Sequence, residues 1–81
     1  MERAVIEQHL ARAQMAVYQA IEHVRRHKEI IGRLGHRGES AVLAQARGLL
    51  TTFENNLRLH IEERNRVQRE MADFDRNDAQ S

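Results

Sequence analysis

The sequence predicts an all-α protein, an antiparallel two-helix hairpin of the coiled-coil type. In two long segments the apolar residues recur at alternating steps of three and four, which places them on one face of a helix. A glycine-rich break separates the segments, and the chain contains no proline. The first stripe comprises Ile6, Leu10, Ala13, Val17, Ala20, Val24, His27, Ile31 and Leu34; the second comprises Leu43, Ala46, Leu50, Phe53, Leu57, His60, Arg64, Val67, Met71 and Phe74.

The two stripes match each other when the second is read backwards against the first. Leu34 then faces Leu43 and Ile6 faces Met71, and every facing pair of residue numbers has the same sum. A constant sum is expected of an antiparallel hairpin, because both helices rise at the same rate per residue from a common turn.

The first helix is expected to run from about residue 3 to 34. Gly35 suits a left-handed residue at its end, and residues 35–39 form the predicted glycine-rich turn, with Gly38 allowing a second positive φ. Ser40 is the predicted N-cap of a second helix over about 40–74. An acidic tail, 75–81, has almost no apolar residue to dock and is expected to fray.

Composition limits the classes of function. The 81 residues form one domain, with 41% hydrophobic and 31% charged residues. The absence of cysteine excludes disulfides, thiolate metal sites and cysteine nucleophiles. A net charge of +1 argues against strong nonspecific binding to nucleic acid, although segment 20–48 is mildly basic and the C-terminal segment acidic.

Apolar residues outside the stripes predict further packing. Three lie on one shoulder near the hairpin tip and two on the other shoulder near the middle, which widens the apolar face beyond a two-helix seam. A homodimeric four-helix bundle is the simplest closure, and a partner protein that contributes the missing helices is the alternative. The tip residues are Ile30, Val42 and Leu49, and the middle residues are Ile21 and Ile61.

Three polar residues interrupt the stripes, namely His27, His60 and Arg64. We interpret them as polar layers that set the register of the bundle, with Arg64 reaching Glu63 or a carboxylate of a partner. A second interpretation is a pH switch, because burial disfavours the charged form of histidine and stability would then fall below a pH of about 6.5.

Metal binding and catalysis have weaker support. His23 and His27 stand four residues apart on one helix face, as metal ligands do, but two ligands do not complete a site, so no metal or cofactor is expected.

Gly48 lies inside the second helix, where it allows close packing or is a tolerated weakness. We find no phosphate-binding loop, Ser-His-Asp set or isolated carboxylate pair, and we expect no enzymatic activity.

The first residues contain no apolar run long enough for a signal peptide, and no apolar run is long enough to cross a membrane, so a cytoplasmic protein is expected. The predicted function is that of a small protein–protein interaction or regulatory protein that presents a helical face to itself and to another protein. The alternative is a bundle that senses a ligand, a metal or pH through its histidines.

Several blocks of the chain resemble a group of small helical proteins from rhizobia and related alphaproteobacteria. The resemblance implies a helical hairpin and a bacterial origin, and it implies no activity. The chain departs from the pattern in two places: Ala16 stands where the group has a further histidine, and the turn is a few residues longer. The blocks are residues 9–13, 23–31, 49–54 and 59–66.

Overall fold

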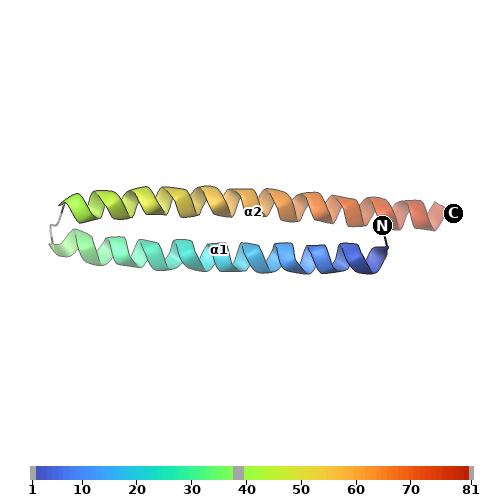
Figure 1. Cartoon of the computed structure of the whole chain (residues 1–81), viewed down its shortest axis with the longest axis horizontal. Coiled ribbons are helices and arrows are strands. Elements are labelled where there is room, and N and C mark those ends of the chain that lie inside the picture. The colour runs from blue at the N-terminus through green and yellow to red at the C-terminus, as the bar shows by residue number, and fades with distance from the viewer. Residues whose placement is uncertain (1, 38–39, 81) are drawn as a thin grey trace.

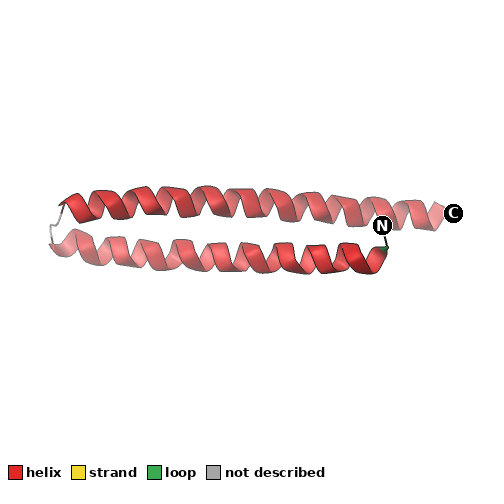
Figure 2. Ribbon diagram, in the orientation of Figure 1, coloured by secondary structure: helices red, strands yellow, loops and turns green. Residues whose placement is uncertain are grey.

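The computed structural model describes residues 2–37 and 40–80 and contains two long helices. Helix α1 spans Arg3–Arg37 and α2 spans Ser40–Gln80. They lie side by side and antiparallel, with the hairpin tip at one end and both termini near the other (Figure 1). The described chain is helical almost throughout (Figure 2), and its extents are 64 × 14 × 13 Å. The predicted all-α hairpin is therefore confirmed.

The core is a single narrow seam between the helices. All of its fully buried residues belong to the two apolar stripes, and most of them are small. No polar or charged side chain is fully buried among the described residues. The buried residues are Ile6, Val17, Ala20, Val24, Ala46 and Val67.

Contacts between the helices agree with the constant-sum register. Arg3 Nε donates a hydrogen bond to Asp75 Oδ1 at 2.9 Å, one residue from the expected position of its partner. The ring of His23 lies 5.5 Å from that of Phe53, centroid to centroid, again one residue from the expected partner. The stripes therefore meet in the predicted register.

Helix α1 continues three residues beyond the predicted end at Leu34. Gly35, predicted to take a left-handed conformation there, has ordinary helical geometry instead. A glycine inside a helix costs only about 1 kcal/mol relative to alanine, so it need not end a helix whose flanking residues favour it. The expectations for Gly38, and for the side chain of Ser40 as a cap, lie outside what the structure describes.

Helix α2 continues six residues beyond the predicted end at Phe74, so residues 75–80 of the expected frayed tail are helical. Two polar interactions support this extension. Asp75 accepts the hydrogen bond from Arg3 of α1, and Arg76 Nη2 lies 2.8 Å from Asp73 Oδ1, one turn away. Local ion pairs of this kind stabilise a helix that lacks apolar contacts.

The exposed faces of both helices carry further ion pairs along their length. Arg25 pairs with Glu22 and Glu29 on α1, and Arg66 pairs with Glu63 on α2. Each exposed pair contributes little alone, and together they favour the helical conformation of segments with only one apolar face. Neither helix has, within its described residues, a stretch long and apolar enough to cross a membrane.

Candidate functional site

The two sides of the seam differ in character. Residues seven apart share a side of a helix, so two rows of residues, one on each helix, line each side of the hairpin. We call one side the histidine flank and the other the Ile61 flank. The histidine flank is lined by His9, Ala16, His23, Asn56, His60 and Glu63, and the Ile61 flank by Val24, Lys28, Glu54, Leu57, Arg58 and Ile61.

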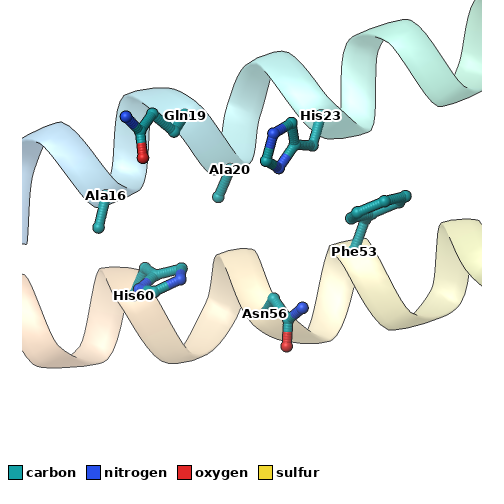
Figure 3. A pocket seen from close by; sticks show the side chains of 7 residues that line it. All are labelled: Ala16, Gln19, Ala20, His23, Phe53, Asn56 and His60. Atoms are coloured by element: carbon teal, nitrogen blue, oxygen red, sulfur yellow. The ribbon is translucent and has the colours of Figure 1, made fainter.

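A shallow groove runs along the histidine flank. Its first hollow, of about 290 Å³, lies where the small side chains of Ala16 and Ala20 leave space between the helices (Figure 3). A second hollow of about 390 Å³ shares Ala16 and His60 with the first, so the two are continuous. The first is lined by Ala16, Gln19, Ala20, His23, Phe53, Asn56 and His60.

His23 and His27 act together in packing. Their rings lie 5.5 and 5.2 Å from the ring of Phe53, so the two imidazoles of α1 enclose one aromatic ring of α2. His27 is half-buried, and its Nε2 donates a hydrogen bond to the backbone carbonyl of Ala46 at 2.9 Å. The four-residue spacing that suggested metal ligands is explained by contact with Phe53. Among the described residues, no three His, Asp or Glu side chains are grouped as a metal site requires.

The other two polar residues of the stripe are not fully buried. His60 is exposed, and it lines the groove between the helices together with Ala16 and Ala20. Arg64 is half-buried, and its guanidinium donates hydrogen bonds to Asn65 Oδ1 at 3.1 and 3.3 Å. Of the two predicted partners, Glu63 is instead hydrogen-bonded by Arg66, and a carboxylate of another chain stays a prediction.

Near the tip, the histidine flank becomes apolar. Ile30 lies seven residues after His23, and Leu49 lies seven before Asn56, so they continue the two rows of this flank. We call the set of Ile30, Val42 and Leu49 the tip shoulder. Their exposed fractions are 43%, 45% and 50%, so each leaves about half of its surface in water.

The Ile61 flank has an apolar centre. Val24, Leu57 and Ile61 line a hollow of about 370 Å³, edged by charged residues of both helices. Ile61 of α2 is half-buried. Ile21 of α1, which lies one turn before Val24, is 47% exposed. The two shoulders expected from the sequence therefore lie on opposite flanks of the hairpin.

Three large exposed apolar residues were not predicted as surface features. Met15, Tyr18 and Leu59 each expose more than half of their surface. They lie outside both stripes, on outward faces of their helices. The angular position of each residue around its helix would have identified these three as exposed, because none of them lies next to the seam.

The ion pairs change the titration of the carboxylates they contain. The hydrogen bond from Arg25 lowers the pKa of Glu22 to about 2, and Arg26 adds to this effect. The hydrogen bond from Arg66 likewise lowers the pKa of Glu63 on the histidine flank. These carboxylates are ionised at neutral pH and are already paired, so neither has the raised pKa of a general acid.

No protein-family model, curated protein or solved structure matches this chain. The resemblance to the rhizobial group therefore stays a prediction, and the surfaces above are interpreted from their own chemistry.

Proposed function

We propose that this chain is a small, non-enzymatic protein–protein interaction or regulatory protein whose tip shoulder docks against another protein. The observation that supports this most is the half-exposed state of Ile30, Val42 and Leu49 on one flank. Burying a large aliphatic side chain fully stabilises a complex by about 1.5–3 kcal/mol. Three such residues, each already half-buried, offer a compact apolar anchor of the kind that dominates interface energetics.

The proposal includes a homodimer that forms a four-helix bundle. The chain exposes 6125 Å² of surface, whereas a compact monomer of its mass, 9.5 kDa, exposes about 5,000 Å². The excess is about 1,000 Å² per chain, and a standard interface buries roughly 800 Å² on each partner. Association with a second copy removes this excess.

The surroundings of the tip shoulder indicate the chemistry of the partner. Arg33 is exposed one turn from Ile30, and it has no ion-pair partner among the described residues. A partner segment that combines aliphatic and acidic residues complements this surface. The proposed setting is the cytoplasm, where proteins without disulfides are usual.

Substitution within the tip shoulder tests the proposal. We expect Leu49→Asp to abolish capture of a partner protein from cells of the source organism, because the new carboxylate would have to be desolvated in the interface. Leu59→Asp is the matched control, since Leu59 is equally exposed but lies outside the tip shoulder. Circular dichroism checks that both variants stay helical. Equal capture by the two variants would remove the tip shoulder from the proposal.

A second candidate function, sensing of a ligand, a metal or pH, is favoured by the groove of the histidine flank. His9, His23 and His60 all line it, and two small alanines keep it open (Figure 3). A ligand that binds only the folded state raises the melting temperature by mass action. Melting curves with and without Zn²⁺ test the metal form of this candidate, and an unchanged melting temperature at millimolar Zn²⁺ would exclude it.

A further inference from the structure

The charges of the Ile61 flank are distributed unevenly about its apolar centre. On α1, Lys28 lies towards the tip and Glu7 towards the termini; on α2, Arg47 lies towards the tip and Asp75 towards the termini. All four follow the seven-residue steps of this flank from Ile21 or Ile61. The flank therefore has basic residues towards the tip and acidic residues towards the termini, and Glu54 and Arg58 border the apolar centre between them.

Two of these charges are unpaired within the hairpin. Neither Lys28 nor Arg47 has an ion-pair partner among the described residues. At the other end Glu7 and Asp75 share the single cation Arg3, which leaves that cluster one negative charge in excess. The basic end of one chain and the acidic end of another are thus electrostatically complementary.

The spacing on α2 is symmetric about Ile61. Arg47 precedes Ile61 by two seven-residue steps, and Asp75 follows it by two. If two copies of α2 pack antiparallel with Ile61 on the two-fold axis, Arg47 of each copy lies opposite Asp75 of the other. The helix α1 fits the same axis to within about one turn, because the midpoint between Glu7 and Lys28 lies close to the level of Ile61 in the register of the hairpin.

We propose that a second copy of this chain packs antiparallel on the Ile61 flank, with the two-fold axis near Ile61. This inference rests on the proposed homodimer and names its interface and direction. The apolar centre, Ile21 and Ile61 with the hollow lined by Leu57, becomes the middle of the interface. Arg47 of each copy forms an ion pair with Asp75 of the other copy, one pair at each end of the interface.

The proposed dimer leaves the tip shoulder of each copy accessible. The tip shoulder lies on the opposite flank, so the second copy does not cover it. The two tip shoulders of the dimer point away from each other and are about 45 Å apart along the rod, given a rise of about 1.5 Å per residue. Such a dimer is bivalent, and it bridges two molecules of a partner that binds the tip shoulder.

Disulfide trapping tests the position of the axis. The chain has no cysteine, so a single Ile61→Cys substitution introduces the only thiol. We expect oxidised glutathione to convert this variant to a covalent dimer at micromolar concentration, with release of two molecules of reduced glutathione, because a residue on a two-fold axis meets its own copy. Leu49→Cys, about 36 Å along the rod from its copy in the proposed dimer, is expected to stay unlinked. Linking of Leu49→Cys in preference to Ile61→Cys would overturn the inference.

Charge reversal tests the direction of packing. We expect Arg47→Glu and Asp75→Lys each to raise the dimer dissociation constant on the order of tenfold, because each places like charges opposite each other twice per dimer. The double variant is expected to restore the wild-type value. Arg12→Glu, which makes the same change of net charge on the histidine flank, is the control and is expected to leave dissociation unchanged.

Sedimentation equilibrium across a concentration series measures all four variants against the wild type. A dimer that is insensitive to the Arg47 and Asp75 reversals overturns the inference while leaving the homodimer intact. A wild-type protein that stays monomeric overturns both. Docking of a partner on the tip shoulder is tested separately by the Leu49→Asp comparison, so failure of the dimer and failure of the interaction surface remain distinguishable.

Discussion

The imidazole of His27 joins the two helices more directly than any other described polar side chain of the seam. It donates a hydrogen bond to the carbonyl of Ala46 and packs on Phe53. A half-buried hydrogen bond contributes about 0.5–1.5 kcal/mol, and the aromatic contact adds to it. His60 makes no comparable contact and is exposed. Two histidines of the same predicted stripe therefore differ in their contribution to stability.

We expect His27→Ala to lower the free energy of unfolding by about 1–2 kcal/mol, after allowing for the higher helix propensity of alanine. His60→Ala is the control, and its effect should stay within about 0.5 kcal/mol because the side chain is exposed. Urea denaturation monitored by circular dichroism measures both. Equal losses in the two variants would contradict the structural role given to His27.

Substitution of Gly48 is expected to raise the stability of the protein, in contrast to substitution of His27. A Cβ built at this position meets no atom within 4 Å, so the glycine serves neither close packing nor a turn. We expect Gly48→Ala to stabilise the protein by about 0.5–1 kcal/mol, or a few degrees of melting temperature, because alanine has less conformational entropy to lose. Ala44→Gly, exposed one turn earlier on α2, should destabilise it by a similar amount.

Each helix combines a narrow apolar face with charged faces that pair locally. Because the seam is narrow, local ion pairs between residues three and four apart supplement it, each stabilising its helix by about 0.2–0.5 kcal/mol. Glu22 is the centre of one such set, with Arg25 Nη2 at 2.6 Å and Arg26 Nε at 3.0 Å. The continuation of α2 past Phe74 depends on the same kind of contact.

This pairing predicts a loss of stability in acid. The folded-state pKa of Glu22 is about 2, below its ordinary value of 4.5, so folding favours the ionised carboxylate. The contribution is complete above a pH of about 4.5 and disappears as the pH falls towards 2. We expect Arg25→Gln to flatten the decline of helicity over this range.

Arg69→Gln is the matched control, since Arg69 is exposed and has no ion-pair partner among the described residues. It should keep the pH profile of the wild type in circular dichroism. A profile of Arg25→Gln identical to that of the wild type would show that the Glu22 pairs do not contribute.

The whole molecule is a thin rod with too much surface for its mass. A two-helix seam buries few large side chains, and six residues, of which two are alanines, are fully buried in the described chain. Below about 70–80 residues a single core rarely supplies more than 3–5 kcal/mol. Stability and function are therefore linked in the proposed antiparallel dimer, which covers the Ile61 flank and leaves the tip shoulder available for a partner.

The sequence by itself determined the hairpin, the identity of the seam and its register. These features follow from the spacing of apolar residues, because burial is proportional to apolar area and a helix repeats its faces regularly. The helix ends were predicted less well. Gly35 remains helical because one glycine costs only about 1 kcal/mol, and residues 75–80 remain helical with the support of the ion pairs of Asp75 and Arg76.

Only the tertiary structure decided how the polar residues of the stripes are used. His27 donates a hydrogen bond to the carbonyl of Ala46, whereas His60 lines the open groove beside Ala16, although both occupy equivalent positions of the repeat. The difference depends on which acceptor or aromatic ring stands across the seam, and spacing along one helix carries no such information. The groove beside Ala16 and the charge arrangement about Ile61 likewise become visible only when the second helix is in place, because both are properties of two elements together.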